Sequence, residues 1–361
     1  MKSILFLIHG TAPKPVGGVK IVYQYANMLV QKGYGVTVLF GEKRKAHVSP
    51  VEWGREFFKY IIKKITRYDK RTWFSLDKRV NLKYVFEFSA EKCAAYDVLV
   101  ATMLSTSYHL AALRLKSCTK YLYFVQGFEA WNASKPCVLD SYRLPLKKIA
   151  ISPWLYDVIK SVDDNVVYIP NGFDFTYFSL LQPIVQRTRY EIAMLYHENS
   201  RKRCADTFAA LDIVKQKFPN LHVNMFGAFP APRNLPSWYS YTQKPNKAQH
   251  NAIYNASAIF VNASEQEGWG LTVGEAMICG CAVVCSDNQG HLIMAKDEDT
   301  ALVFKVGAIE QMASQIERLI LDDALRCALA ERGNKFIQQF SWEKSLEKFI
   351  AVIEGGEKEQ S

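Results

Sequence analysis

The sequence lacks the features that mark several classes of protein. No uninterrupted apolar run approaches the roughly 18 residues that a membrane-spanning helix requires. The eight cysteines are scattered, with no CxxC pair and no zinc-ligand spacing, so we expect reduced thiols in a cytoplasmic protein. No repeat of fixed period occurs, and only residues 355–361 have the composition of a disordered segment. These absences predict a globular protein without membrane spans or zinc sites.

Positive charge, in contrast, is in surplus. The formal net charge of the 361 residues is +10, which suits phosphate-rich ligands, nucleic acid or an anionic membrane. No motif of a DNA- or RNA-binding fold occurs, so we expect no nucleic-acid partner. The apolar start, Met1–Gly10, has no signal-peptide cleavage site and is interpreted as a buried strand. The length predicts about two domains.

Short apolar strands alternate with helices in both halves of the chain. In the first half we expect strands at Ser3–Ile8, Val36–Phe40, Val98–Thr102 and Tyr121–Val125, and a helix over Val19–Lys32. In the second half we expect strands at Ile192–Tyr196, Leu221–Phe226, Ala258–Val261, Ala282–Ser286 and Ala301–Phe304, helices over Asp206–Gln216 and Thr272–Cys279, and a last helix over Phe340–Ile353. The pattern predicts an α/β protein with two Rossmann-like parallel-sheet domains. Ligands of such sheets bind beyond the carboxyl ends of the strands, so we expect the sites in a cleft where these edges face each other.

The strongest motif is the segment 264–280, which follows a predicted strand and begins a helix. Gly268 and Gly270 let the backbone approach a ligand closely, and the free N–H groups of a helix start favour a phosphate. Glu267 and Glu275 then flank that phosphate, where carboxylates are favourable if they bind hydroxyls of a sugar or ribose. Two plainer interpretations remain open: Thr272-x-x-Glu275 is a capping box, and Glu267 is a solvated loop acid.

This segment resembles the glutamate–seven–glutamate region of retaining glycosyltransferase family 4, and the match extends through Ala276-Met277, Gly280 and Val283-Val284. The resemblance implies the GT-B fold, with an N-terminal acceptor domain at 1–168, a nucleotide-sugar domain at 169–339 and a C-terminal helix at 340–361 that returns to the first domain. It also implies roles for single residues. Glu267 would contact the donor sugar, Glu275 the ribose, and the backbone of Gly270, Leu271 and Thr272 the diphosphate.

Three further segments look like the same family. Gly17-Gly18-Val19 is similar to its N-terminal glycine loop, which implies that Gly18 lies against the diphosphate and acceptor. Ser152-Pro153, with Ser152 as expected N-cap, and the turn around Asn171 and Asp174 resemble the family's crossing between domains. Phe340-Ser341-Trp342 looks like the start of the family's tail helix.

The basic cluster Arg201-Lys202-Arg203 follows a strand of the second domain. Family spacing makes Lys202 the match for a lysine that neutralises the departing diphosphate. The family's usual arginine five places earlier is His197 here, and Arg201 is the candidate replacement. The alternative for the whole cluster is a solvated surface patch.

The stretch after the strand at Tyr121–Val125 also departs from the family. Many members have a histidine near the reacting sugar where this chain has Gln126, and the stretch looks more like a subset that includes some rhamnosyltransferases. Gln126 or Glu129 is therefore a candidate for contact with sugar or acceptor, and a structural role at a helix start is the alternative. His109 is expected to pack rather than to act in catalysis. Asp297-Glu298-Asp299 has the form of a metal-binding DxD motif but falls where the family has a turn, so we expect no metal.

Residues 53–74 form a second basic segment, in which aromatic and aliphatic residues alternate with lysine and arginine. Arg55, Lys59, Lys63 and Arg67 recur every four residues and would share one helical face. Such a helix fits an anionic membrane surface, and it fits equally well an ordinary helix packed on the first sheet with a solvated basic face.

The resemblance implies a metal-independent transferase that moves a sugar, with retention of configuration, from a nucleotide-diphosphate donor to a glycan or lipid-linked acceptor. The donor is a substrate, and no further cofactor is expected. The expected setting is bacterial surface polysaccharide or lipopolysaccharide synthesis, in the cytoplasm or at the inner face of the membrane. A catalytically silent GT-B subunit that supports a partner enzyme is the main alternative, and a nucleotide-sugar epimerase is a weaker one.

Overall fold

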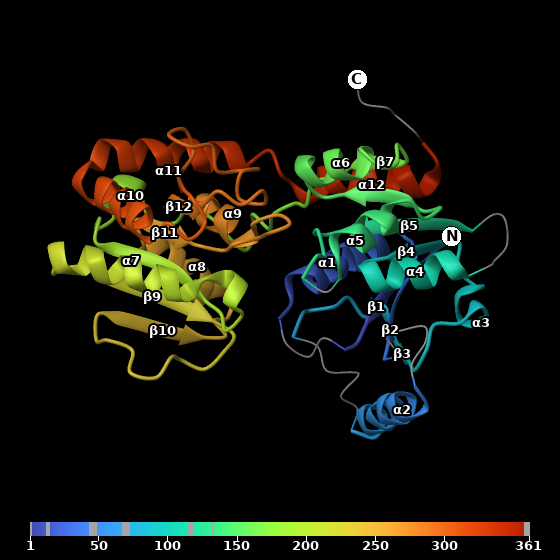
Figure 1. Ribbon diagram of the computed structural model, residues 1–361. Helices are drawn as coiled ribbons and strands as arrows, with labels where there is room; N and C mark the ends of the chain where they lie inside the picture. The colour runs from blue at the N-terminus through green and yellow to red at the C-terminus, as the bar shows by residue number, and fades with distance from the viewer. Residues whose placement is uncertain are drawn as a thin grey trace. The chain divides into compact units, whose positions relative to one another are not determined.

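The chain divides into two compact α/β units, which are described separately. The computed structural model describes residues 2–11, 15–42, 49–66, 73–113, 119–131 and 133–356. The first unit comprises Met1–Asn171 with Glu343–Ser361, and the second comprises Gly172–Trp342. Figure 1 colours the chain from blue to red in sequence order, so the red C-terminal helix is seen among the blue and green elements of the first unit.

The first unit is built on a seven-stranded parallel sheet in the order β3-β2-β1-β4-β5-β6-β7. The strands are β1 Ser3–His9, β2 Gly35–Gly41, β3 Asn81–Val85, β4 Val98–Ala101, β5 Lys120–Val125, β6 Lys147–Ala150 and β7 Val166–Tyr168. The helices are α1 Gly17–Gln31, α2 Pro50–Ile65, α3 Ala90–Cys93, α4 Leu104–Ala112, α5 Lys135–Tyr142, α6 Pro153–Lys160 and α12 Trp342–Glu354.

Aromatic packing joins the C-terminal helix to the first sheet. Phe349 of α12 stacks on Phe6 of β1, with ring centroids 6.2 Å apart, and contacts Tyr25 of α1 at 4.8 Å. All three side chains are fully buried, so the end of the chain forms part of the core of the first unit. At α6 the expected boundary appears, with Ser152 before Pro153, but the Ser152 hydroxyl makes no capping hydrogen bond and is buried without a partner.

The second unit is built on a six-stranded parallel sheet in the order β10-β9-β8-β11-β12-β13. The strands are β8 Glu191–Tyr196, β9 His222–Gly227, β10 Tyr239–Gln243, β11 Ile259–Asn262, β12 Ala282–Ser286 and β13 Leu302–Phe304. The α-helices are α7 Cys204–Lys217, α8 Lys247–Ala256, α9 Leu271–Ile278, α10 Ile309–Leu321 and α11 Asp323–Ile337, and short 3-10 turns lie at η2 Ile184–Gln186 and η3 Ser200–Lys202.

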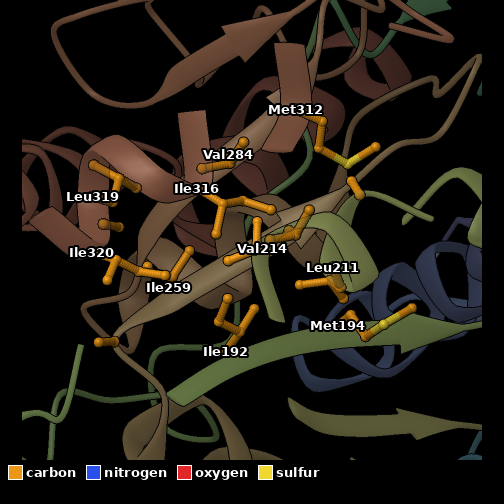
Figure 2. Close-up of a cluster of buried hydrophobic side chains, with 14 of the residues drawn as sticks. Ile192, Met194, Leu211, Val214, Ile259, Val284, Met312, Ile316, Leu319 and Ile320 are labelled. Atoms are coloured by element: carbon orange, nitrogen blue, oxygen red, sulfur yellow. The ribbon is translucent and has the colours of Figure 1, made fainter. Parts of the chain in front are cut away.

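Helices α7 and α10 pack their apolar faces on one side of this sheet (Figure 2). Leu211 and Val214 of α7 meet Ile316 of α10 over the side chains of Ile192 and Ile259, and all five are fully buried. The core of the second unit therefore fixes β8 and β11 side by side.

In each sheet the order in which successive strands are added reverses once. In the second unit the chain runs outward from β8 through β9 to β10 and then returns to β11, on the other side of β8. In the first unit the same change occurs between β1 and β4. The loops that leave the carboxyl ends of two such neighbouring strands diverge and open a crevice, which is where ligands bind in sheets of this kind.

Close packing of α9 yields a testable prediction. A Cβ added at Gly274 would overlap the ring of Phe173, so Gly274→Ala is expected to destabilise the protein by about 1–3 kcal/mol through overpacking. Gly54 of α2 is the matched control, because nothing lies within 4 Å of the added Cβ. Gly54→Ala should leave stability unchanged or raise it by about 0.5–1 kcal/mol, as helix propensity predicts. Equal melting temperatures for the two variants would contradict this account of the packing of α9.

Candidate active site

The loops after β8 and β11 meet at the crevice of the second unit. After β8, the Asn199 side chain accepts a hydrogen bond from the Arg201 backbone N–H at 3.0 Å and orders the short turn η3. The backbone N–H of Glu265, in the loop after β11, donates to the Arg201 carbonyl at 2.8 Å. These bonds bring Lys202 and Glu267 together, although they are far apart in the sequence.

Lys202 and Glu267 form an ion pair in which Lys202 Nζ donates to Glu267 Oε1. Their side chains are 27% and 18% exposed, so the pair is largely shielded but still reached by solvent. Burial opposes ionisation of Glu267, but the Lys202 ammonium outweighs it and holds the pKa of the carboxyl below its ordinary value. Glu267 is therefore neither a solvated loop acid nor unpaired, and Lys202 is not part of a merely solvated patch.

The start of α9 provides the second part of the site. Gly270 precedes the helix with φ of 78°, a conformation that favours glycine, and an added Cβ would lie 3.1 Å from the Gly290 carbonyl oxygen and 3.3 Å from His291 Cδ2. Leu271 and Thr272 are the first helical residues, so their N–H groups have no acceptor within the helix. The side-chain hydroxyl of Thr272 accepts a hydrogen bond from Asn262 Nδ2 at 3.0 Å.

The capping-box interpretation of Glu275 is wrong. The N-cap of α9 is Gly270, and no side chain caps the helix, because Thr272 already lies inside its first turn. Glu275 is only 4% exposed and lies near Tyr177. Burial, and then the charges of Glu275 and Asp174, raise the pKa of the Tyr177 hydroxyl to about 12. A buried carboxylate without a capping role is consistent with a ligand-binding group.

His291 is a candidate residue that sequence reasoning missed. The ring is fully buried, with Nδ1 2.9 Å from Asn288 Nδ2 and 3.1 Å from the Ser286 carbonyl oxygen, and Nε2 has no hydrogen-bond partner. The neighbouring Gly290 packs against the backbone of Glu267, where no Cβ would fit. A lone histidine in a loop after β12 has no sequence signal that distinguishes it from an exposed one.

Burial of His291 makes stability depend on pH. Burial lowers the pKa of the imidazole from 6.5 to about 4. The unfolded chain then binds a proton that the folded chain does not bind, so stability is full above about pH 6.5 and falls by roughly 3 kcal/mol as the pH drops to about 4. His291→Asn should flatten this part of the profile, measured as the melting temperature at a series of pH values. Burial raises the pKa of Glu129 in the first unit to about 7, so this carboxyl stabilises the folded protein at low pH. The quantity to compare at each pH is therefore the difference in melting temperature between the variant and the native protein. If the difference in melting temperature between the variant and the native protein is the same at every pH from about 4 to about 6.5, His291 does not cause the pH dependence of stability.

His197 does not supply the charge of the family's arginine. Its ring contacts Phe229 at 4.6 Å, and Nδ1 accepts a hydrogen bond from the Asn199 backbone N–H at 2.9 Å. Burial and then the charge of Lys202 lower the pKa of His197 below 6.5, so the ring is neutral at pH 7. Arg203 is bound to Asp206 at 2.6 Å, and Lys202 is paired with Glu267, so these two cations of the turn before α7 already have a carboxylate partner.

The predicted residues of the first unit gather at the carboxyl edge of β5 and the start of α1. A Cβ at Gly18 would lie 3.3 Å from Gln126 Oε1, which is buried and has no hydrogen-bond partner. Glu129 accepts a hydrogen bond from the Leu104 backbone N–H at 2.8 Å, at the start of α4, and burial raises the pKa of Glu129 to about 7. Glu129 therefore has the structural role at a helix start, whereas Gln126 retains an unused acceptor.

His109 packs, as its surroundings in α4 require. Its ring lies edge-on to His9 at 4.9 Å and to Phe88 at 5.8 Å, and its Nδ1 is 2.9 Å from the Ser105 carbonyl oxygen. The acidic run 297–299 is also engaged by the protein. Asp297 accepts from the Val303 N–H, and Glu298 and Asp299 pair with Arg318 and Arg332. Within the described residues, no group of three or more histidine, cysteine, aspartate and glutamate side chains is arranged to hold a metal ion.

Comparisons with known proteins place this site in a family. Residues 200–336 match the family of glycosyl transferases group 1. Phosphatidyl-myo-inositol mannosyltransferase from Mycolicibacterium smegmatis is 23% identical over 206 residues, which are 54% of this chain and 53% of that protein. O-antigen chain mannosyltransferase B from Escherichia coli is 35% identical over 98 residues, 27% of this chain and 25% of that protein. The matches thus span about half the length of these relatives or less.

Solved structures cover both units. Sucrose-phosphate synthase from Thermosynechococcus elongatus has a TM-score of 0.72 at 15% identity, over 98% of this chain and 99% of that one. Anabaena HepE, solved with UDP and glucose, has a TM-score of 0.71 at 14% identity, over 98% and 100%. At such low identity the likeness shows the fold alone. Residues 200–336 thus match the group 1 glycosyl transferases, and the chain has the GT-B fold.

Proposed function

We propose that the protein is a retaining glycosyltransferase that moves a sugar from a nucleotide-diphosphate donor to a glycan or lipid-linked acceptor. The observation that carries the proposal is the ion pair of Lys202 and Glu267 beside the free N–H groups at the start of α9. This arrangement offers positive charge and N–H donors to a diphosphate, and a carboxylate to sugar hydroxyls, at the crevice between β8 and β11. Relatives that act in mannosyl transfer and in O-antigen synthesis support a role in bacterial surface polysaccharide or lipopolysaccharide synthesis.

The proposed reaction needs no protein nucleophile. The bond between the anomeric carbon and the diphosphate oxygen breaks, and its electron pair stays on the diphosphate. The acceptor hydroxyl oxygen forms the new bond on the same face, and its proton passes to a diphosphate oxygen. Lys202, with Arg201 beside it, stabilises the charge that develops on the diphosphate, while Glu267 orients the donor sugar and Glu275 the ribose.

A binding screen tests the proposal. Purified protein is mixed with a panel of nucleotide-diphosphate sugars, and its melting temperature is followed, since a ligand that binds only the folded state raises it. We expect one donor to raise the melting temperature, and that donor to be consumed when a glycan or lipid-linked acceptor is added. If no member of the panel shifts the melting temperature, the proposed donor site is wrong.

A catalytically silent GT-B subunit is the second candidate. The observation that favours it is that a histidine, His197, stands where the family has an arginine. A neutral imidazole in place of an arginine leaves the diphosphate with one cation fewer than the family pattern provides. Such a subunit would bind a donor or glycan without turnover. The donor screen separates the two, because binding without consumption of the donor in the presence of acceptors would support the silent subunit.

We further propose that α2 rests on an anionic membrane surface at the inner face of the membrane. None of its residues is buried, and its apolar side chains divide into two faces. One face contacts the first sheet: Trp53 and Phe57, which remain 42% and 38% exposed, approach Phe86 with ring centroids 5.3 and 5.2 Å apart. In Figure 1 the helix lies beyond β3, the edge strand.

The other face of α2 is apolar and open to solvent. Val51, Phe58, Ile62 and Ile65 recur at helical spacing and are 84%, 65%, 44% and 76% exposed. The exposed Arg55 and Lys59 border this stripe, whereas Lys63 is already paired with Glu42 and Arg67 lies outside the described residues. An apolar stripe bordered by cations matches the interior and the headgroups of an anionic bilayer. No helix within the described residues is long and apolar enough to cross a membrane.

Making the exposed stripe more polar should weaken membrane binding. Phe58→Ser with Ile62→Ser is expected to weaken binding to phosphatidylglycerol-containing vesicles about 100-fold in cosedimentation, because two apolar side chains no longer enter the bilayer. Leu321→Ser is the control, since Leu321 at the end of α10 in the second unit is an apolar side chain that is 70% exposed and lies outside α2. Equal vesicle binding by the double variant and the control would refute the membrane role of α2.

A further inference from the structure

An open pocket of 540 Å³ lies in the second unit at the end of the sheet opposite to the candidate active site. It is lined by residues 187–190, which precede β8, and by the first turns of α11. The candidate active site follows the other end of β8, which is six residues and thus about 20 Å away. The pocket is therefore a separate place in the same unit.

Three arginines line this pocket against one carboxylate. Asp323 bridges two of them, with Arg326 Nη2 at 2.8 Å and Arg189 Nη1 at 3.5 Å. Arg187 donates to backbone carbonyls, including that of Ser257 at 3.0 Å, and its pKa is lowered by burial. The thiol of Cys281 lies near Arg187, but burial raises the pKa of this thiol to about 12, so it adds no negative charge. The charges of these groups sum to +2.

The buried guanidinium of Arg326 has unused hydrogen-bond donors. Arg326 is only 3% exposed, and its Nε and Nη1 have no partner, nor has Nε of Arg187. Buried donors without an acceptor are costly, more so when they carry charge. The start of α11, with the backbone of Asp323 and Ala324 at the pocket, adds the positive end of a 15-residue helix.

We propose that this pocket binds a small phosphate monoester. A phosphoryl dianion matches the charge of +2, and its oxygens accept from a planar guanidinium in pairs. The pocket is larger than a phosphate alone requires, and Val185, Tyr190 and Ala324 line it with apolar or aromatic surface for an organic remainder. Such a site, apart from the donor site, gives the protein a second ligand whose binding stabilises the second unit.

Calorimetric titration with phenyl phosphate, a small aromatic phosphate monoester, tests the proposal. The titration is made on Lys202→Met protein, in which the candidate donor site has lost its cation, and on native protein. We expect one saturable site with the same affinity in both. Phenyl sulfate carries one negative charge and is expected to bind roughly tenfold more weakly. Affinity lost in Lys202→Met would place the phosphate in the donor site and overturn the proposal.

Variants of the arginines that line the pocket test whether phenyl phosphate binds there. Arg189→Ser, at a partly exposed position, should weaken binding of phenyl phosphate roughly tenfold or more without unfolding the protein. Arg326→Lys keeps the charge but loses the planar donor pair, and we expect a similar loss. Arg332→Ser is the control, because Arg332 lies on α11 and binds Asp299 outside the pocket. Unchanged affinity in Arg189→Ser and Arg326→Lys, or no saturable binding at millimolar concentrations, would overturn the proposal whether or not a nucleotide sugar binds.

Discussion

Replacing Lys202 with methionine is expected to lower sugar transfer about 10²–10³-fold, the effect of removing one group that stabilises transition-state charge. Methionine keeps the unbranched apolar part of the side chain but removes the ammonium that pairs with Glu267. The loss should appear in kcat, because the charge on the diphosphate grows as the bond to the sugar breaks. The turnover of donor and acceptor measures it, with the melting temperature as the check that the variant is folded.

A charge-swapped double variant separates catalysis from stability. Lys202→Glu with Glu267→Lys restores an ion pair between the same two loops and should recover most of the melting temperature that either single change loses. Transfer should remain as low as in Lys202→Met, because a carboxylate would now face the diphosphate. If the double variant recovers transfer as well, the pair serves only to hold the loops together.

Replacing Glu275 with glutamine is expected to weaken donor binding roughly 10–100-fold, the contribution of a charged hydrogen bond to a hydroxyl. Glutamine fills the same volume in a position that is only 4% exposed, so packing is conserved while the charge is lost. Titration of the donor identified by the screen measures the dissociation constant. The same variant should bind phenyl phosphate with unchanged affinity, because that pocket lies at the other end of the sheet.

Glu265→Gln is the matched control for this measurement. Glu265 is an exposed acid of the loop between β11 and α9 and has no assigned role. We expect the Glu265→Gln variant to bind the donor with the same dissociation constant as the native protein. If Glu265→Gln and Glu275→Gln weaken binding equally, a general loss of negative charge would explain both, and the ribose-binding role of Glu275 would be rejected.

The fold class was predictable because its signals are local. Buried parallel strands have apolar runs on both faces, and β8, β11 and β12 begin or end within one or two residues of the predicted runs. The two-sheet α/β class and the GT-B fold are confirmed. The edge strand β10 gave no such signal, because its sequence Tyr239-Ser240-Tyr241-Thr242-Gln243 is largely polar and only Tyr239 in it is buried.

Contacts between distant segments were not predictable from the sequence. Nothing in the chain around Lys202 or Glu267 indicates that they pair, because the bond depends on the order of β8 and β11 in the sheet. The burial of His291 and the charge excess around Arg326 arise in the same way, from packing between elements. The two faces of α2 are a partial exception, since its periodicity is visible in the sequence but the choice of the buried face is not.

The crystal structure of the complex with the nucleotide-diphosphate sugar found by the screen tests the central claim most directly. The account predicts diphosphate oxygens within hydrogen-bond distance of Lys202 Nζ and of the N–H of Leu271 or Thr272, with the carboxylate of Glu267 at hydroxyls of the sugar and that of Glu275 at the ribose. A diphosphate bound at the arginine pocket before β8, with the crevice after β8 and β11 unchanged, would contradict it.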